Sequence, residues 1–301
     1  MKFEIELFTS LCINRKKFLE MRTNMPGHPS TDDQCAVKNG LLPGDEIVSI
    51  KKFADMILDV SILLLESGAH CERINRNVQR IAKSSNYNVE MLMSFTAISV
   101  SVTDKDQPRH TITENKSVKH HGVHYGALTG TSLLTWKLAD GEIAIDEMER
   151  ELENIKTTTK YPIWLVRLSI GVACGCLCLL AGGNWLDTLF AFFASGIGLT
   201  VKQEMVKRHF NLMISILCSA FATTLIASIS VLSEYRFSPE SSVATAVLFL
   251  IPGVPLINSI IDLLEGYIPI GLARGAFGGF ILLCIAVGMF LSMALTGINN
   301  F

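Results

Sequence analysis

The sequence predicts a multi-pass α-helical membrane protein of about five spans, preceded by an amino-terminal cytoplasmic α+β domain. Two observations support this fold class. Residues 162–301 hold only six of the 26 basic and six of the 28 acidic side chains in the 301-residue chain. The same stretch contains five long apolar runs, and a helix that crosses a bilayer needs about 17–25 mostly apolar residues. One part of the chain is therefore suited to lipid and the other to water.

Composition also excludes other classes of protein and sets the expected domain boundaries. The net charge is −2, and neither part has a basic excess, so we expect no nucleic-acid partner. A hydrophobic fraction of 49% is too high for a disordered chain. Breakers such as Pro26 and Pro43 predict an irregular leader over residues 1–45. We expect the cytoplasmic α+β domain over residues 46–161 and the membrane domain over residues 162–301.

The cytoplasmic domain is predicted to begin with two amphipathic helices. Apolar residues recur at helical spacing from Phe53 to Leu64, and Gly68 is suited to end the first helix. Apolar positions between Ile74 and Ala82 mark the second helix. Its polar face is basic, which indicates either a solvated surface or a contact with an anion or lipid headgroup. The basic residues are Arg73, Arg76, Arg80 and Lys83.

Strand-like alternation follows these helices. Apolar and polar residues alternate over Tyr87–Met91 and over Ile98–Val102, and a turn at Asp104–Pro108 leads into Arg109–Thr113. This pattern predicts a small antiparallel meander. Two further helices complete the predicted domain, over residues 125–136 and 145–155.

Three histidines between the predicted strands and helices are the only candidates for a metal or catalytic site. His120 and His124 are four residues apart and could share a helix face, with His121 beside them. No acidic residue stands between them in a metalloprotease pattern, so an exposed polar surface is the alternative. The chain has no P-loop, dinucleotide-binding glycine pattern or G-x-S-x-G motif. We therefore expect no metal, no cofactor, no enzymatic activity and no use of ATP.

The membrane domain is predicted from its apolar runs. The second run is short, and Pro252 and Pro255 interrupt the fourth. Each run could instead be a buried core helix, but five runs joined by short loops within 140 residues argue against that alternative. The predicted spans cover residues 163–182, 186–201, 212–232, 242–264 and 272–297.

The distribution of positive charge predicts the orientation. Cytoplasmic flanks of membrane helices are enriched in Lys and Arg. These residues precede the first span, follow the second and open the fifth: Lys156, Lys160, Lys202, Lys207, Arg208 and Arg274. We expect a cytoplasmic (inner) membrane protein with its amino-terminal domain in the cytoplasm. Five spans then place the carboxyl terminus outside.

The fourth span carries the main functional signal. Pro252, Gly253 and Pro255 break a helix in the membrane, and such breaks form substrate sites in secondary transporters. Asn258 follows, and Asp262 lies one turn further on the same face. A carboxylate at membrane depth is costly unless it is paired or wetted, which favours a role in substrate or proton binding. The alternative is that Asp262 ends the helix at the cytoplasmic interface.

Other polar residues extend this candidate pathway. Arg274 is the nearest partner for Asp262, and it could neutralise Asp262, bind a carboxylate or act as a topology anchor. Asp187 is expected at the outer mouth of the pathway. Ser195 lies in the second span, where bulky and small residues are mixed. Glycines spaced by four residues indicate close helix packing. These glycines are Gly171, Gly175, Gly271, Gly275 and Gly279.

Over about residues 50–300 the chain resembles the threonine/serine exporter family. The proline break through Asp262, together with Gly271-Leu272-Ala273-Arg274, is the most specific part of the resemblance. Further shared motifs are Leu65-Glu66-Ser67-Gly68-Ala69 with Arg73, Gly182-Gly183-Asn184-Trp185-Leu186-Asp187 and Phe192-Phe193-Ala194-Ser195. His70 departs from the small or acidic residue that the family more often has.

The resemblance implies a fold and a function. Full-length members have a cytoplasmic domain and ten spans in two halves, and this chain resembles the first half, as in a split branch that includes proposed succinate exporters. It implies proton-driven export of a small polar metabolite, of the threonine/serine type or alternatively a dicarboxylate. A second five-span subunit or another copy of the chain would complete the transporter. A membrane sensor with a metabolite-binding domain and a membrane-anchored enzyme are the competing classes.

Overall fold

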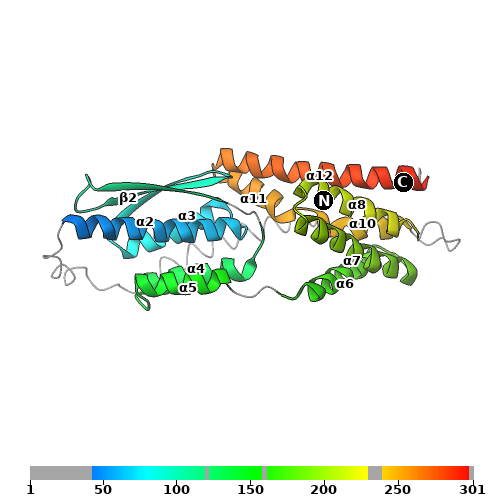
Figure 1. The fold of residues 1–301 in the computed structure, drawn as a ribbon, viewed down its shortest axis with the longest axis horizontal. Coiled ribbons are helices and arrows are strands. Elements are labelled where there is room, and N and C mark those ends of the chain that lie inside the picture. Colours follow the sequence, from blue (N-terminus) through cyan, green and yellow to red (C-terminus); the bar gives the residue numbers. More distant parts are fainter. Residues whose placement is uncertain (1–42, 119–121, 158–160, 230–238, 298–301) are drawn as a thin grey trace, which may run out of the picture. The chain divides into compact units, whose positions relative to one another are not determined.

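The computed structural model describes residues 43–118, 122–157, 161–229 and 239–297 (Figure 1). Ile47–Phe301 form one compact unit, which includes both the water-soluble and the apolar composition. The predicted leader lies almost wholly outside the described residues. The predicted change of domain near residue 161 is a change of composition within this unit, and the domain division stays a prediction.

Two helices and a tight turn begin the described chain. Helix α2 covers Pro43–Glu66 and helix α3 covers Cys71–Ser84. Gly68, between them, has φ of +90°, a left-handed conformation that side chains with a Cβ rarely adopt. The backbone N–H groups of Ser67 and Ala69 donate to the last carbonyls of α2 and close the turn. The turn therefore has a fixed shape and presents the start of α3.

The predicted meander is found as three antiparallel strands in sequence order. They are β1 (Tyr87–Met93), β2 (Ala97–Asp104) and β3 (Thr111–Ser117). Val100 pairs with Met91 on one side and Glu114 on the other. Ile98, Val100 and Val102 are fully buried, as the alternation requires of strands with one face on a core.

Helices α4 (Tyr125–Ala139) and α5 (Ile145–Thr157) complete this region. Figure 1 shows the sheet, the α2–α3 pair and the α4–α5 pair as successive layers. One hydrophobic cluster joins the three layers, with Ile57, Ile81 and Met148 fully buried in it. Stability of this region therefore comes from apolar residues that sequence periodicity identifies.

The apolar half of the chain is helical. It contains α6 (Ile163–Leu180), α7 (Trp185–Lys207), α8 (Leu212–Ala227), α10 (Pro239–Val247), the 3-10 turn η1 (Leu248–Leu250), α11 (Gly253–Leu264) and α12 (Ile268–Thr296). By length and composition, α6 and α12 can each cross a membrane. Residues Ser241–Leu250 and Gly253–Leu264 form a third candidate, a pair bent by 64°. The described residues thus provide two or three spans by this criterion.

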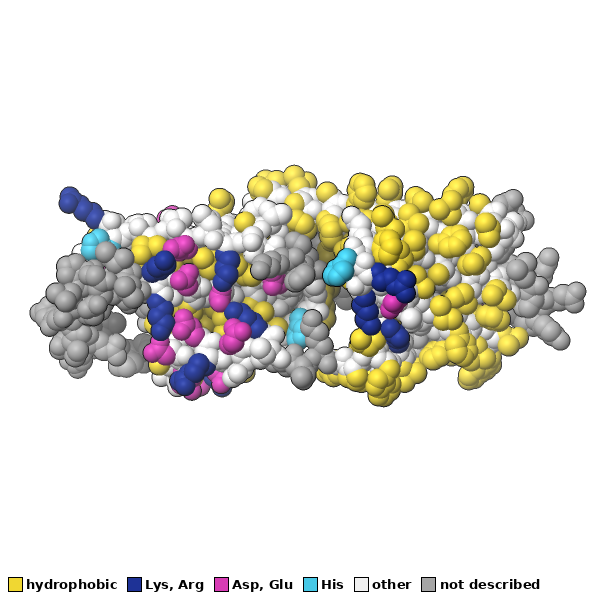
Figure 2. Space-filling view, in the orientation of Figure 1, with side chains coloured by type: hydrophobic (Ala, Val, Ile, Leu, Met, Phe, Trp, Pro, Cys, Tyr) yellow, Lys and Arg dark blue, Asp and Glu magenta, His cyan; other side chains and the backbone are white. Residues whose placement is uncertain are grey.

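The surfaces of the two parts differ as their compositions predict. In the view of Figure 2, hydrophobic side chains cover most of the apolar helices apart from one group of mainly Lys and Arg side chains, and mixed acidic and basic side chains gather over α2–α5. Large residues on α6 and α12 are exposed, among them Trp164, Leu180, Phe280 and Phe290. Exposed apolar bands of this kind are suited to lipid or to another membrane subunit.

Most of the predicted packing glycines lie where a Cβ would be crowded. A Cβ on Gly171 would be 3.0 Å from Phe192, one on Gly271 would be 2.9 Å from Leu263, and one on Gly275 would be 2.7 Å from Ser259 Oγ. A Cβ on Gly175 would be only in ordinary contact with Thr188, at 3.4 Å. Gly279 differs, because a Cβ there would meet no described atom within 4 Å. Gly278 occupies the corresponding close contact, 2.7 Å from Leu256.

Candidate functional site

The predicted break is present between η1 and α11. Pro252 is the residue before the first turn of α11, and the two segments that it joins are bent by 64°. Pro255 lies in that first turn, where backbone N–H groups have no partner within the helix. Its missing N–H therefore costs little, and α11 continues to Leu264. The prolines set the direction in which α11 presents its polar face.

That polar face meets the α2–α3 turn. The Asn258 amide donates to the carbonyl oxygen of Gly68 at 2.8 Å. One turn later, Asp262 Oδ1 accepts from the backbone N–H of Cys71 at 2.7 Å. Asp262 is fully buried. The fourth predicted span and the predicted cytoplasmic domain therefore share a polar contact.

Arg274, on α12, completes this contact. Its Nη1 donates to Asp262 Oδ2 at 2.7 Å, and its Nη2 donates to the carbonyl oxygen of Ala69 at 2.9 Å. Its side chain is 6% exposed, so the ion pair is buried. Removing one partner of a buried pair costs about 3–5 kcal/mol, because the other charge is left without compensation. The predicted pair is thus present, and it also holds the turn.

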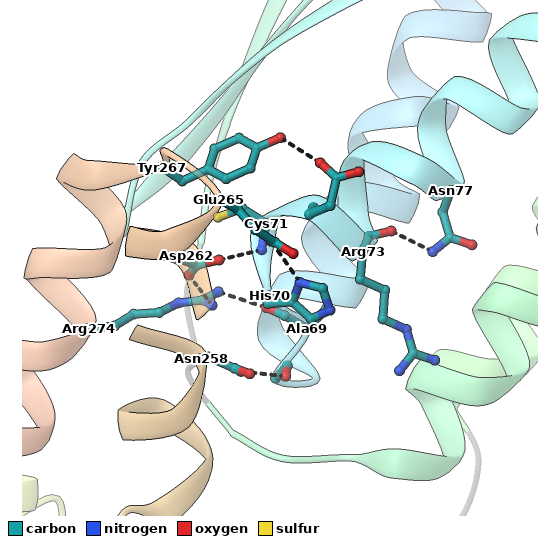
Figure 3. A network of polar contacts seen from close by, with 12 residues as sticks. Ala69, His70, Cys71, Arg73, Asn77, Asn258, Asp262, Glu265, Tyr267 and Arg274 are labelled. Atoms are coloured by element: carbon teal, nitrogen blue, oxygen red, sulfur yellow. Dashed lines mark hydrogen bonds and ion pairs between the residues drawn. The ribbon is translucent and has the colours of Figure 1, made fainter. Parts of the chain in front are cut away.

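Asp262 also acts as the cap of α3. His70 precedes this helix and makes no side-chain capping bond. The carboxylate of Asp262 instead receives the first N–H of the helix, where the helix dipole favours negative charge (Figure 3). Burial raises the pKa of the Cys71 thiol, and the negative charge of Asp262 raises it further. Cys71 is therefore a thiol, held beside the pair.

Two weaker contacts surround the buried pair. His70 Nδ1 lies 3.3 Å from Glu265 Oε2. The Tyr267 hydroxyl donates to Glu72 at 3.2 Å, and burial together with Glu72 raises the pKa of Tyr267 to about 12. Both contacts join α3 and its preceding turn to the end of α11. Figure 3 shows them on the same side of α3 as Asp262.

Potential metal ligands occur here but are poorly suited to a metal. His70, Asp262 and Glu265 each place one ligand atom within 4.8 Å of the others. Both oxygens of Asp262 are already engaged, one by Cys71 N–H and one by Arg274. A guanidinium 2.7 Å from a ligand oxygen repels a cation. The arrangement favours a carboxylate or a proton over a metal ion.

A cavity of about 90 Å³ lies beside the pair. The polar side chains that line it are Asn258 and Arg274, which are donors, and Phe95 and Phe277 supply aromatic surface. The predicted residues Pro255, Asn258 and Arg274 are thus brought to one cavity. Its lining consists of Leu65, Gly68, Phe95, Gly122, Val123, Val254, Pro255, Asn258, Arg274 and Phe277.

The sequence reasoning missed what the α2–α3 turn contributes. Gly68 and Ala69 present carbonyl oxygens, and Cys71 presents an N–H. These are backbone groups, which every residue type has, so no residue pattern predicts them. The one available signal is the motif around Gly68 that the family resemblance includes.

Other predicted pathway residues lie elsewhere. Asp187 is buried and forms a capping box with Asn184 at the start of α7. Ser195 is also buried, and its hydroxyl donates to the carbonyl oxygen of Ala191. Neither residue lines the cavity beside Arg274. Their part in a pathway stays a prediction.

The histidine cluster divides in a similar way. His124 accepts a hydrogen bond from the N–H of Ala127 and thereby caps α4. The contact is structural, and it engages one of the two ring nitrogens, Nδ1. The other two predicted residues, His120 and His121, lie outside the described residues.

Comparison with known proteins places residues 55–296 in the family described as "Putative threonine/serine exporter". The chain is 28% identical over 247 residues to "Probable succinate transporter subunit YjjP" of Escherichia coli, which covers 81% of this chain and 95% of that protein. The Klebsiella aerogenes protein of the same name is also 28% identical, with 81% and 94% covered. "Probable threonine/serine exporter" of Mycobacterium tuberculosis is 24% identical, with 85% of this chain and 48% of that protein covered. No solved structure matches the chain.

Proposed function

Because this chain belongs to the threonine/serine exporter family, we propose that it is one half of a secondary transporter for a small polar metabolite. In this proposal the transporter exports its substrate across the cytoplasmic membrane and uses the proton-motive force. The substrate is a threonine/serine-type amino acid or a dicarboxylate such as succinate. The observation that carries the proposal is the buried Asp262–Arg274 pair beside a broken helix and a cavity.

The pair suggests how substrate and proton are coupled. A carboxylate entering the cavity would find Arg274, which has donors suited to it. If that carboxylate takes the place of Asp262 on Arg274, Asp262 is left buried without its partner. A buried, unpaired carboxylate is costly unless it takes up a proton. Substrate binding at Arg274 and proton binding at Asp262 would then be linked.

The proposed topology has five spans, formed by α6, α7, α8, the bent α10–α11 pair and α12. The exposed apolar surfaces of α6 and α12 support a position in the membrane. The charge distribution supports an amino-terminal domain in the cytoplasm and a carboxyl terminus outside. On this topology the cavity beside Arg274 lies near the cytoplasmic end of the bent pair.

A second subunit is also part of the proposal. Two features of the relatives support it, namely the word "subunit" in their name and their alignment with this chain over 94–95% of their length. The exporter of M. tuberculosis is covered over only 48%, as expected if it contains both halves. We therefore propose that a separate five-span protein, or another copy of this chain, completes the transporter.

The dicarboxylate alternative has support from the same comparison. The two relatives matched nearly end to end are named as succinate transporter subunits. In addition, the polar side chains of the cavity are an amide and a guanidinium, which suit carboxylates. Threonine and succinate both carry a carboxylate, so the proposed carboxylate site suits either class.

The experiment that tests the function measures efflux of labelled threonine and labelled succinate from loaded cells. Cells would make this chain alone, a five-span partner alone, or both. Partner-dependent loss of one label identifies the substrate class, and dissipation of the proton gradient should stop that loss. If both proteins reach the membrane and neither label is lost faster than in control cells, the hypothesis of a membrane sensor replaces that of a transporter.

A further inference from the structure

The polar face of α3 carries three arginines. Arg73, Arg76 and Arg80 follow one another at intervals of three and four residues, so they form a row along the helix. In the described part of the chain, none of the three forms a salt bridge. We call these three residues the arginine row, and we propose that it binds a small, multiply charged anion.

The arginine row is built into the protein, unlike an ordinary solvated face. Arg73 and Arg80 are partly buried between α3 and α4. Arg73 Nη2 donates to the Ser132 hydroxyl at 3.2 Å, and Arg80 Nη1 donates to the Thr135 hydroxyl at 2.8 Å. These contacts are neutral, so they orient the guanidinium groups and leave their charge uncompensated. Figure 3 shows Arg73 extending toward α4, away from Asp262.

The packing around Arg80 fixes its position further. Its guanidinium lies 3.7 Å from the centroid of the Trp136 ring, a cation–π contact. Arg80 also donates a hydrogen bond to the side-chain oxygen of Asn77, which is buried. The same oxygen accepts a hydrogen bond from the Thr135 hydroxyl. Side chains held in this way lose little freedom when a ligand binds. The remaining N–H donors of the row are available to such a ligand.

The electrostatics of the row favour an anion. Burial lowers the pKa of Arg80, the positive charge of Arg76 lowers it further, and the negative charge of Asp140 offsets only part of this lowering. Three like charges at this spacing repel one another, and a bound anion relieves that repulsion. The row therefore combines excess positive charge with guanidinium groups that are held by neutral contacts.

The spacing indicates the class of ligand. Seven helical residues separate the Cα atoms of Arg73 and Arg80 by about 10 Å, and Arg76 lies between them. Each neighbouring pair can hold one carboxylate or phosphate group. The ligand that fits is a di- or tricarboxylate or a phosphate ester, free in the cytoplasm or as a lipid headgroup. This site is separate from the cavity beside Arg274, and its test does not require transport.

The binding test uses Trp136 as a reporter. The chain has three tryptophans, so the full-length protein with Trp164→Phe and Trp185→Phe retains Trp136 alone. Citrate and inorganic pyrophosphate would be titrated into this protein in detergent. We expect a saturable fluorescence change whose affinity falls with added salt. Calorimetric titration of the protein with its natural tryptophans provides the same measurement without these substitutions.

Matched variants distinguish the row from general positive charge. Arg76 and Arg150 are both exposed, and Arg150 lies on α5. Arg76→Gln should weaken binding by about tenfold or more, and Arg150→Gln should change it by less than about twofold. Circular dichroism of both variants checks that they are folded. Equal binding by the two variants would overturn the proposal.

An experiment with lipid vesicles distinguishes the two sources of the anion, a lipid headgroup and a free anion. The same protein would be reconstituted in vesicles of phosphatidylcholine, with and without phosphatidylglycerol. A Trp136 response to phosphatidylglycerol that Arg76→Gln removes, with no response to citrate or pyrophosphate, identifies a lipid headgroup. A response to the soluble probes identifies a free anion. No response to any of the three probes rejects the site.

Discussion

The carboxylate of Asp262 accepts a hydrogen bond from the backbone N–H of Cys71, which lies 191 residues earlier in the chain. Its other oxygen accepts from Arg274. One buried side chain therefore joins the start of α3 to α11 and α12. A change in the charge of Asp262 acts on a helix cap and on an ion pair together, so the pair can link the membrane helices to the α2–α3 turn.

Replacing Asp262 with asparagine tests this residue in transport. Asp262→Asn keeps a hydrogen-bond acceptor for Cys71 but leaves Arg274 buried without a counter-charge. We expect the protein to insert, to lose about 3–5 kcal/mol of stability, and to lose efflux or its dependence on pH. Efflux at two external pH values, normalised to membrane protein, measures this effect.

Asp55→Asn is the matched control, because Asp55 is exposed on α2. It removes the same charge from the chain without touching the buried pair, and efflux should be unchanged. Normal, pH-responsive efflux in Asp262→Asn would remove Asp262 from the mechanism.

A double substitution separates the structural role of the pair from its role in transport. Arg274→Gln alone leaves Asp262 buried and unpaired. Adding Asp262→Asn makes the pair neutral, and we expect about 1–3 kcal/mol of stability to return relative to Arg274→Gln. Efflux should stay at background, because the double variant lacks both Asp262, which would bind the proton, and Arg274, which would bind the substrate carboxylate. If efflux recovers together with stability in the double variant, the pair has only a structural role.

The positions of helices were predictable because apolar runs and breakers are local signals. The break at Pro252 is present, and α6 ends at Leu180 within the predicted span. The last helix begins at Ile268, earlier than predicted, because Pro269 is tolerated in a first helical turn. The 64° bend and the docking of the α2–α3 turn depend on distant contacts. Such contacts have no local signature.

Gly275 and Gly279 provide a paired test of helix packing. A Cβ at Gly275 would be 2.7 Å from Ser259 Oγ, whose hydroxyl donates to Gly271. Gly275→Leu should therefore separate α11 from α12 and cost about 1–3 kcal/mol, measured by thermal unfolding in detergent. Gly279→Leu should leave the unfolding temperature unchanged, because that position is open. Equal losses in both variants would contradict the packing described.

This glycine pair also shows the limit of spacing arguments. A four-residue repeat selects Gly271, Gly275 and Gly279, but an α-helix has 3.6 residues per turn. The contact face therefore drifts, and Gly278 replaces Gly279 in it. Gly279 is left on an open side of α12, where the proposed partner subunit or lipid would lie beside it. If Gly279→Leu no longer co-purifies with the partner subunit, this result would favour the partner subunit over lipid as the neighbour of Gly279.

Asp59 predicts a pH dependence of stability in the water-soluble region. Burial raises its pKa, but hydrogen bonds and charges from Lys116 and Lys156 outweigh burial, and the net pKa is below 3.8. A lowered pKa in the folded state gives stability that is complete above 3.8 and is lost as pH falls through the folded pKa. Asp59→Asn should cost about 1 kcal/mol at neutral pH.

The control for this prediction is again Asp55→Asn, one turn away on α2. It should show no comparable loss at neutral pH. The difference between Asp59→Asn and the unchanged protein should disappear in unfolding experiments well below pH 3.8. A difference that persists at that acidity would assign the effect to packing.

Reactivity of Cys71 reports whether the α2–α3 turn leaves the buried pair. Cys71 is fully buried, and burial together with Asp262 raises its pKa, so it should react slowly with a maleimide. The test uses a chain whose other seven cysteines are replaced by alanine. In this chain, Asp262→Asn removes the negative charge beside Cys71 and the hydrogen bond from Arg274. The thiol should then react at least about tenfold faster. Asp55→Cys in the fully cysteine-free chain gives the rate of an exposed thiol.

Adding substrate to the protein with Asp262 intact extends this test to the transport cycle. If a substrate carboxylate displaces Asp262 from Arg274, the ion pair that holds the turn is broken, and Cys71 should become more reactive as substrate saturates. The Asp55→Cys rate should not change. Faster Cys71 labelling would identify the turn as a moving part of the transporter, because Cys71 is fully buried while its N–H is bonded to Asp262. A constant low rate at saturating substrate would show that the turn stays docked during binding.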